Sequence, residues 1–334
     1  MSKEVDVSII IPTYNRKEEL TKLLSSLKAQ TLPQRKCEII VIDDGSCDTT
    51  AEFLQREQAA GTLTFSVQDH RGPGAARNMG MKLAQGKVFV FTDTDCIPHP
   101  HWLENLIHPF ADETVGAAGG PEVPDPVEPI LSRCFQFVMT SPLTTGGLRG
   151  AKKQLARYYP RTFNMAVSRK AYEKTGGFKE WYHGEDVEMS FRIKEAGFKL
   201  IYCDDAKVCN HRPATFFRFF LQLLRMGEAR WLLFRTHREL MEPLFLLPLS
   251  AIVLLTVLLV LSPFSPAILS LLKALLTLGI IYLATVGFSA WVSLKSFRAF
   301  FLAPFAFICQ QVGYGVGFLL GMVKKGRSEL LAYS

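Results

Sequence analysis

The stretch from residue 243 to residue 323 carries only three charged side chains, Lys273, Lys295 and Arg298. A helix needs roughly 20 apolar residues to cross about 30 Å of hydrocarbon. The stretch therefore predicts membrane spans near residues 243–262 and 267–293, separated by a Ser-Pro-Phe-Ser-Pro turn. We expect residues 241–323 to form a membrane region.

A third apolar segment covers residues 299–323 and is followed by a basic tail, residues 324–334. Three full crossings would carry the basic residues of this tail to the outer side, against the tendency of basic residues to stay inside. The segment also contains a proline, two glutamines and several glycines. The sequence leaves open whether it is a third span or a re-entrant or interfacial segment.

Residues 213–240 combine aromatic and aliphatic side chains with several arginines. This composition is typical of helices at the headgroup boundary of a membrane; the alternative is a soluble amphipathic helix packed on a domain. The net charge of the chain is +7, and much of the excess lies just before the apolar region. That position favours membrane lipids as partners. No helix-turn-helix, zinc-finger or RNP pattern supports a nucleic-acid partner.

The N-terminal sequence, MSKEVDVSIIIP, passes directly from charged residues into a strand-like run. It lacks the apolar core and small-residue cleavage site of a signal peptide. The seven cysteines are scattered and form no Cys-x-x-Cys pair, which favours reduced thiols over a disulfide framework or a zinc site. We therefore expect a multi-pass protein of the cell membrane whose soluble part lies in the cytoplasm.

Residues 1–212 have the composition of a soluble domain, and strand signals alternate with helix signals in their first hundred residues. Such alternation predicts parallel βαβ units, with helices on both faces of the sheet. The fold class is therefore α/β, a Rossmann-like domain with a mostly parallel sheet. Residues 116–161 are rich in proline and glycine and predict a mobile loop or a substrate-facing insertion. The predicted strands cover residues 5–12, 38–43, 63–67, 88–92 and 199–203, and the predicted helices cover residues 17–30, 49–58, 74–85 and 185–196.

Acidic side chains follow two of the predicted strands at the point where each strand ends: Asp43 and Asp44 after one, Asp93 and Asp95 after another. In an open α/β sheet, ligands bind in the crevice at the carboxyl ends of the strands. Any one of these aspartates is as well explained as a turn former or a helix cap. Together, they predict a site, and the Asp-x-Asp spacing offers two hard oxygen ligands for Mg²⁺ or Mn²⁺.

Two further segments carry groups that suit an anionic substrate. Residues 70–78 are glycine-rich, contain two arginines and open a helix, an arrangement that favours anions, although a plain glycine turn would look similar. Glu185 and Asp186 begin a later helix. Acids in a first helical turn commonly offset the helix dipole, and the functional alternative is a general base that takes a proton from an attacking hydroxyl.

Taken together, these segments resemble the family 2 inverting glycosyltransferases, which have a GT-A fold. The resemblance covers residues 5–211 and depends on the order and spacing of short motifs. These are Pro-Thr-Tyr-Asn-Arg at residues 12–16, Ile-Val-Ile-Asp-Asp-Gly-Ser at 40–46, Gly-Ala-Ala-Arg-Asn-Met-Gly at 74–80, Asp-Thr-Asp at 93–95, Asn-Met-Ala at 164–166, Gly-Gly-Phe at 176–178 and Gly-Glu-Asp at 184–186.

The resemblance implies a role for each matching residue. The donor-binding residues would be Pro12, Tyr14, Asp43, Asp44, Arg77 and Asp93. The metal would lie by Asp93 and Asp95, with Asp95 as the direct ligand, and His211 ends a strand where some GT-A enzymes place a further ligand. Asp186 would be the catalytic base, with Glu185 beside it. A single in-line displacement would then invert the anomeric centre.

The sequence therefore predicts a transferase that moves a sugar from a nucleotide-diphosphate donor, in this family most often a UDP-sugar, to a lipid-linked or cell-envelope glycan acceptor at the cytoplasmic membrane face. The alternative is a membrane scaffold that keeps the fold without catalysis. Nucleotidylyl transfer is disfavoured because residues 9–16 lack a glycine- and lysine-rich loop. Processive synthases of the family carry Gln-x-x-Arg-Trp, and here Met226 stands where that motif has tryptophan.

Overall fold

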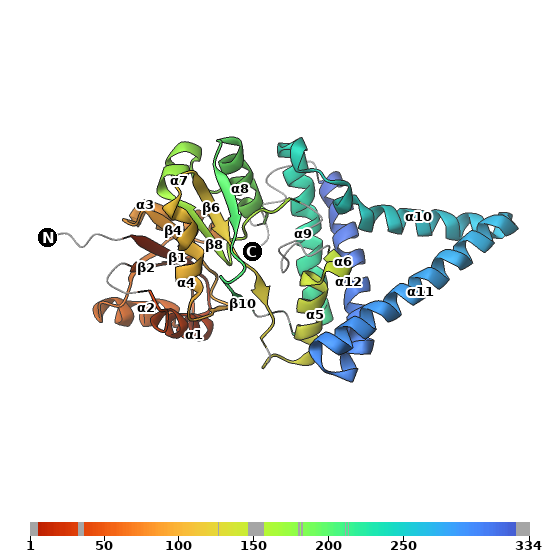
Figure 1. Ribbon diagram of the computed structural model, residues 1–334, viewed down its shortest axis with the longest axis horizontal. Coiled ribbons are helices and arrows are strands. Elements are labelled where there is room, and N and C mark those ends of the chain that lie inside the picture. The colour runs from red at the N-terminus through yellow and green to blue at the C-terminus, as the bar shows by residue number, and fades with distance from the viewer. Residues whose placement is uncertain are drawn as a thin grey trace. The chain divides into compact units, whose positions relative to one another are not determined.

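The computed structural model describes residues 6–32, 37–125, 127–145, 157–179, 181, 183–210, 212 and 214–324. The chain forms two compact units. The first, which we call the N-terminal unit, comprises Met1–Val123 and Arg157–His211, and the second, the helical unit, comprises Pro124–Ala156 and Arg212–Ser334. Residues 124–156, which we expected within the 1–212 domain, thus group with the C-terminal helices. Figure 1 gives the element labels used below.

A mixed sheet forms the centre of the N-terminal unit, and seven of its strands lie within the described residues, in the order β3-β2-β1-β4-β8-β6-β9. β1, β2, β3 and β4 are parallel, while β8 runs antiparallel between β4 and β6. The predicted mostly parallel sheet is confirmed. The strands are β1 (Val7–Thr13), β2 (Cys37–Asp43), β3 (Thr64–Val67), β4 (Val88–Phe91), β6 (Val115–Gly119), β8 (Met165–Ser168) and β9 (Lys199–Tyr202).

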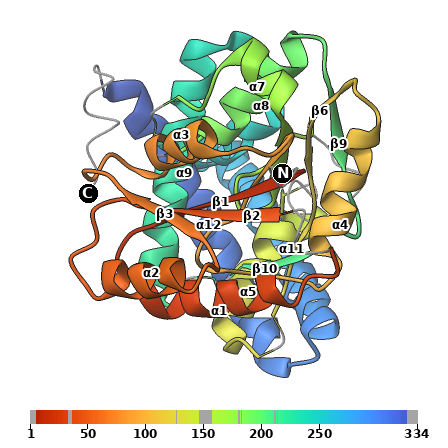
Figure 2. The ribbon, with the colours of Figure 1, turned by 90° about the vertical axis from the view of Figure 1, so that its left-hand side faces the viewer.

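Helices cover both faces of this sheet because its central strands are apolar on both sides. In β1, Ile9 and Ile11 face one apolar cluster and Ile10 faces the other, as the two-residue period of a strand requires. Figure 2 shows α3, α7 and α8 on one face and α1 and α2 on the other. The helices are α1 (Lys17–Lys28), α2 (Thr50–Ala59), α3 (Pro73–Leu83), α4 (Trp102–Ile107), α7 (Arg169–Thr175) and α8 (Glu185–Glu195).

A second, small sheet lies beyond the end of β4, in the order β5-β10-β7. β10 runs antiparallel to β5 and parallel to β7. Because β5 begins at Cys96, directly after the Asp-x-Asp motif, this pairing ties the segment that follows Asp95 to the last part of the N-terminal unit. The strands are β5 (Cys96–Pro98), β7 (Glu122–Val123) and β10 (Val208–Asn210).

The helical unit is built around α9 and α12, which pack closely through glycines. A side-chain carbon placed on Gly317 would lie 2.0 Å from the carbonyl oxygen of Leu224, and one placed on Gly227 would lie 2.2 Å from that of Tyr314. α5 packs beside them, with Phe135 stacked on Phe219 at 4.1 Å between ring centroids. The helices are α5 (Ile130–Thr140), α6 (Pro142–Thr145), α9 (Phe216–Thr236), α10 (Leu247–Leu261), α11 (Pro266–Leu294) and α12 (Phe297–Val323).

Within the described part of the chain, three helical segments are long and apolar enough to cross a membrane: Pro243–Phe264, Pro266–Leu294 and Phe297–Val323. They correspond to the three apolar segments expected from the sequence, and the expectation of C-terminal apolar helices is confirmed. The third segment differs from the others in its burial. Of its most apolar 18 residues, 39% are buried against protein, compared with 6% for each of the first two segments.

The proline- and glycine-rich stretch 116–161 is more regular than a loop. Its described residues contain most of β6, all of β7, and the helices α5 and α6. α5 has a buried face that includes Phe135 and Val138, and this face explains why a segment with loop-like composition at its ends forms a helix in the middle. The expectation of a loop is therefore wrong for residues 130–145, whereas the alternative of a substrate-facing insertion stays a prediction.

Candidate active site

Three parallel strands deliver the predicted site residues to one edge of the main sheet. β1, β2 and β4 are direct neighbours, and their carboxyl ends lie at Thr13, Asp43 and Phe91. Tyr14, Asp44 and Asp93 therefore all follow strand ends at the same edge, the usual position of a ligand crevice in such sheets. Pro12 is buried within β1 and pairs in register with Ile42 of β2.

Asp44 holds the loop that leads from β3 into α3. Its carboxylate accepts hydrogen bonds from the side chain of Gln68 at 2.6 Å and from the backbone amides of Arg71 and Gly72, each at 2.9 Å. His70 contacts the same carboxylate at 2.9 Å and stacks on Tyr14 at 4.2 Å between ring centroids. Asp44 is thus a buried structural acceptor in this state, and the Tyr14–His70 pair is the aromatic surface beside it.

Asp43 is also buried, and it holds the turn that follows β2. One of its carboxylate oxygens accepts the backbone amide of Ser46 at 3.0 Å and the hydroxyl of the same residue. The hydroxyl oxygen of Ser46 in turn accepts the backbone amide of Asn15, which follows β1. Asp43 therefore joins the ends of β1 and β2 at the edge where the site lies.

Arg77 of α3 brings together two parts of the predicted site. Its guanidinium is 3% exposed and donates to Asp93 at 2.7 Å and to Glu185 at 2.8 Å. Burial alone would lower the pKa of Arg77, but the charges of Asp93 and Glu185 outweigh burial and raise it. A permanently charged group thus joins the Asp-x-Asp motif to the first turn of α8.

Glu185 and Asp186 begin α8 after Gly184, whose φ of 85° lies in the region that favours glycine. Burial and the neighbouring charge of Asp186 together raise the pKa of Glu185 to about 8, although the positive charge of Arg77 opposes them. Asp186 accepts the backbone amide of Val187 at 2.7 Å. Glu185 thus faces the buried arginine while Asp186 remains the more accessible carboxylate of the pair.

Asp95 and Asp186 each have an arginine counter-ion that the sequence did not reveal as a site residue. Arg16 approaches Asp95 at 3.1 Å, and Arg161 approaches Asp186 at 3.5 Å. Arg16 lies in the Pro-Thr-Tyr-Asn-Arg motif, which hinted at it, whereas Arg161 lies at the end of the proline- and glycine-rich stretch, outside any motif. Enclosure by the surrounding chain and the charge of Asp93 raise the pKa of Asp95, and Arg16 lowers it.

No three His, Cys, Asp or Glu side chains converge into a metal site within the residues that the structure describes. His211 lies outside the described residues. A cation at the Asp-x-Asp motif would therefore take only part of its coordination from Asp93 and Asp95. Such partial coordination is usual for Mg²⁺, which binds through one or two carboxylates together with substrate phosphates and water. The two aspartates therefore fit a metal ion that binds together with a diphosphate.

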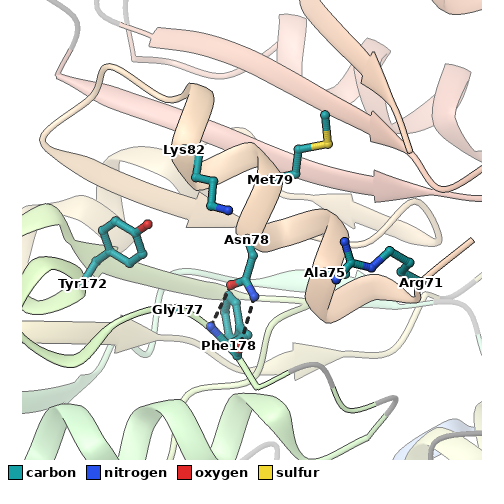
Figure 3. A pocket seen from close by; sticks show the side chains of 8 residues that line it. All are labelled: Arg71, Ala75, Asn78, Met79, Lys82, Tyr172, Gly177 and Phe178. Atoms are coloured by element: carbon teal, nitrogen blue, oxygen red, sulfur yellow. Dashed lines mark hydrogen bonds between the residues drawn. The ribbon is translucent and has the colours of Figure 1, made fainter. Parts of the chain in front are cut away.

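A cavity of about 340 Å³ opens beside α3, on the face of the sheet that α3, α7 and α8 cover. Figure 3 shows its lining, in which Lys82 and Tyr172 lie at one end and Arg71 at the other. Asn78 stands in the middle and forms two hydrogen bonds with the backbone of Phe178. None of the described residues that line the cavity is acidic, so they add no carboxylate to the site at the strand ends.

Comparison with known proteins identifies relatives of a large part of the chain. Residues 8–176 match the family model described as glycosyl transferase family 2. Glycosyltransferase AglE of Haloferax volcanii is 30% identical over 237 residues, which cover 69% of this chain and 75% of that protein. A pre-mycofactocin glycosyltransferase of Mycobacterium tuberculosis is 31% identical over 204 residues, 59% of this chain and only 41% of that protein.

Among solved structures, the mannosyltransferase PcManGT of Pyrobaculum calidifontis, in complex with GDP-Man and Mn²⁺, has a similar fold. The TM-score is 0.63 at 20% sequence identity, and the match covers 92% of this chain and 86% of that one. At this identity the likeness concerns the fold, and it extends over both units of the chain. The expected GT-A fold is thereby confirmed.

Proposed function

The chain belongs to glycosyl transferase family 2, and we propose that it transfers a sugar from a nucleotide-diphosphate donor to an acceptor hydroxyl with inversion of the anomeric centre. The observation that carries this proposal is the bridge made by Arg77 between Asp93 and Glu185. It supports one site in which the Asp-x-Asp motif and the acids of α8 act on the same substrate.

Asp186 is the proposed base in this reaction. Of the α8 pair, Glu185 is the one that pairs with Arg77, and the side chain of Asp186 is the more exposed, at 14% against 7%. A placed carboxylate that removes the hydroxyl proton contributes about 10²–10⁴-fold to the rate. The contact between Arg77 and Glu185, at 2.8 Å, holds the first turn of α8 in place beside it.

Asp93 and Asp95 are the proposed holders of a divalent cation, Mg²⁺ or Mn²⁺, with His211 as a candidate third ligand. When bound, such a cation supplies positive charge against the diphosphate leaving group. The solved relative of similar fold contains Mn²⁺ with GDP-Man, which agrees with this choice. Arg77 and Arg16 would orient the two carboxylates before and after the cation binds.

The nucleoside is proposed to lie over the ends of β1 and β2. The Tyr14–His70 pair offers an aromatic surface there, and Asp43 and Asp44 fix the two loops that border it. Pro12, buried in β1, sets the direction in which the chain leaves the strand. UDP is the proposed nucleotide, and a GDP-sugar is the alternative to test beside it.

The helical unit is proposed to anchor the enzyme, with α10 and α11 crossing the bilayer as a hairpin. α12 is proposed to lie along the interface, because one of its faces is covered by α9, which carries charged residues such as Arg218 and Arg225 that hydrocarbon does not tolerate. Figure 1 shows α9 and α12 side by side, with α10 and α11 leading away from them.

Two crossings would return the basic tail to the side of the N-terminal unit, in agreement with the positive-inside tendency. The acceptor is then a lipid-linked or cell-envelope glycan at the cytoplasmic face. Green fluorescent protein fused after Ser334 should fluoresce, since it folds in the cytoplasm. Activity of alkaline phosphatase fused at the same position would instead show that the tail lies outside.

The proposed reaction is tested with the full chain in membranes, a panel of nucleotide sugars and product detection by mass spectrometry. Asp186→Asn should lower transfer by about 10²–10⁴-fold while nucleotide binding survives. Asp205→Asn, a change of the same kind at an exposed surface position, is the control and should retain full activity. Full transfer by the Asp186 variant would remove that residue from the role of base.

A further inference from the structure

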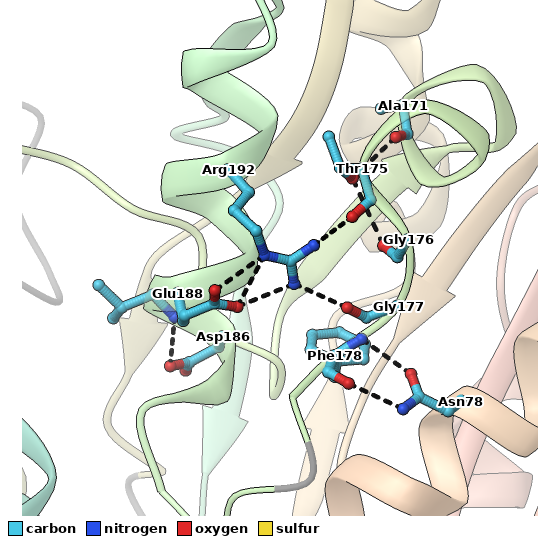
Figure 4. A network of polar contacts seen from close by, with 10 residues as sticks. Asn78, Ala171, Thr175, Gly176, Gly177, Phe178, Asp186, Glu188 and Arg192 are labelled. Carbon is cyan, nitrogen blue, oxygen red and sulfur yellow. Dashed lines mark hydrogen bonds and ion pairs between the residues drawn. The ribbon is translucent and has the colours of Figure 1, made fainter. Parts of the chain in front are cut away.

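The connection between α7 and α8 carries the chain into the proposed catalytic acids. Thr175 is the last residue of α7, Gly176–Phe178 follow it, and Gly184 directly precedes α8. Figure 4 shows side chains from α8 and α3 reaching the backbone of this segment. We call residues 175–178 the clamped loop.

From α8, Arg192 holds the clamped loop by its carbonyl groups. Its guanidinium donates to the carbonyl oxygens of Thr175 and Gly177, the latter at 2.7 Å. The same guanidinium makes a two-point contact with the carboxylate of Glu188, at 2.8 and 2.9 Å, one helical turn earlier. Glu188 is fully buried, so it orients Arg192 and keeps its donors directed at the loop.

From α3, Asn78 holds the other end of the clamped loop. Its side-chain amide donates to the carbonyl of Phe178 at 2.9 Å and accepts the amide of the same residue at 2.8 Å. A side-chain carbon on Gly177 would lie 2.3 Å from the Asn78 oxygen, so glycine is required for this approach. Asn78 directly follows Arg77, which binds Glu185.

The two contacts of α3 therefore reach both ends of the connection. Arg77 holds the first residue of α8, and Asn78 holds the loop that precedes it, while Arg192 binds the loop to the body of α8. A shift of a reacting group by about 1 Å can cost about 10²-fold in rate. Burying the charged pair Arg192–Glu188 costs desolvation energy, so the pair is a poor choice for packing alone. Its directional hydrogen bonds can, however, fix the position of the loop.

We propose that Arg192 and Asn78 are positioning residues. They hold the first turn of α8 against α3 and so keep Asp186 at a fixed position relative to the Asp-x-Asp motif. This proposal rests on the proposed function of Asp186. Neither residue needs to touch substrate, and their loss should lower kcat while leaving the KM for the donor nearly unchanged.

The test compares Arg192→Gln with Arg169→Gln in the full chain. Arg169 is a matched control, because it also donates to two backbone carbonyls, those of Gly86 and Ala84 at 2.9 and 2.8 Å. It follows β8 at the edge where β4 begins, whereas Asp93 follows the opposite end of β4. We expect Arg192→Gln to lower kcat at least about tenfold with a donor KM within about twofold of wild type. Arg169→Gln should keep the wild-type kcat, even if it lowers the thermal stability by as much as Arg192→Gln does.

Two further variants keep the proposal testable if Arg192→Gln folds poorly. Arg192→Lys retains a charge for Glu188 but not the fork that reaches two carbonyls, so its kcat should be intermediate. Asn78→Ser, on the other helix, should reproduce the loss of kcat without a change in donor KM. Wild-type kcat in both variants would overturn the proposal, as would equal kcat losses in the Arg192 and Arg169 variants of equal stability.

Hydrogen exchange separates this proposal from the proposed function. In Arg192→Gln, amide exchange over residues 185–190 should be at least about tenfold faster than in wild type, and in Arg169→Gln it should be unchanged. If wild type shows no sugar transfer, the proposed function fails even where exchange behaves as expected. If transfer is normal but exchange over α8 is the same in both variants, only the clamp is wrong.

Discussion

The packing of α9 on α12 predicts that one added methyl group will destabilise the helical unit. A side-chain carbon on Gly317 would meet the carbonyl oxygen of Leu224 at 2.0 Å and its carbonyl carbon at 2.7 Å. Both atoms belong to helix backbone and cannot rotate away, so the two helices must separate. Gly279 of α11 is the matched control, since nothing lies within 4 Å of a carbon added there.

The expected magnitude follows from this geometry. Overpacking typically costs about 1–3 kcal/mol, and Gly317→Ala should lie near the upper end because the obstacle is backbone. Gly279→Ala carries no clash and removes the entropic cost of a helical glycine, about 0.5–1 kcal/mol. With about 2–4 °C per kcal/mol for a domain of this size, the Tm of Gly317→Ala should lie roughly 7–16 °C below that of Gly279→Ala.

Thermal unfolding of the full chain in one detergent, followed by tryptophan fluorescence, measures this difference. Trp231 of α9 packs against Phe318 of α12 at 5.6 Å between ring centroids, so its emission reports the contact in question. Gly227→Ala should resemble Gly317→Ala, because its added carbon would lie 2.2 Å from the carbonyl oxygen of Tyr314. Equal Tm values for Gly317→Ala and Gly279→Ala would refute the close approach of the two helices.

Three further predictions concern the N-terminal unit. Burial raises the pKa of Glu185 from 4.5 to about 8, so between these pH values the folded chain binds a proton that the unfolded chain has lost. The free energy of unfolding should therefore fall by up to about 1.4 kcal/mol per pH unit as pH rises through this range. Glu185→Gln should remove the corresponding slope of Tm against pH. Gly80→Ala would place a carbon 2.4 Å from Ile10 and should cost about 1–3 kcal/mol in thermal unfolding. Asp44→Ala leaves the amides of Arg71 and Gly72 without their acceptor and should cost about 1–3 kcal/mol, measured in the same way.

The parallel part of the sheet was predictable because its strands are short, apolar and separated by helices of clear period. β1, β2 and β4 therefore lie where the sequence put them. The position of β8 was not predictable, because Met165–Ser168 inserts between β4 and β6, and no local pattern specifies which distant segment pairs with an edge. α5 was missed for a related reason, since its buried face packs on α9, about eighty residues later in the chain.

The acids of the candidate site were predictable because each follows a strand or begins a helix, where local sequence gives a signal. Their partners were not. Arg161 lies in a stretch without helical or strand period, and its approach to Asp186 depends on the fold of distant residues. Only the structure shows that Glu185 is the more buried member of the Glu185–Asp186 pair, because adjacent carboxylates in one helical turn look alike in sequence.

The charge balance of the site leads to a last prediction. Asp93, Asp95, Glu185 and Asp186 share three arginines, Arg77, Arg16 and Arg161. Each of these arginines is thus already paired with an acid, and the approach of a diphosphate to these acids is unfavourable unless a cation comes with it.

Nucleoside diphosphate should therefore bind the full chain at least about tenfold more weakly in EDTA than with Mn²⁺, as measured by calorimetry. In a variant with both Asp93→Asn and Asp95→Asn, two carboxylates fewer repel the phosphates and fewer ligands hold the ion, so the dependence on Mn²⁺ should shrink. Equal affinity of the wild-type chain with and without the cation would mean that the arginines themselves leave their carboxylates to bind the diphosphate.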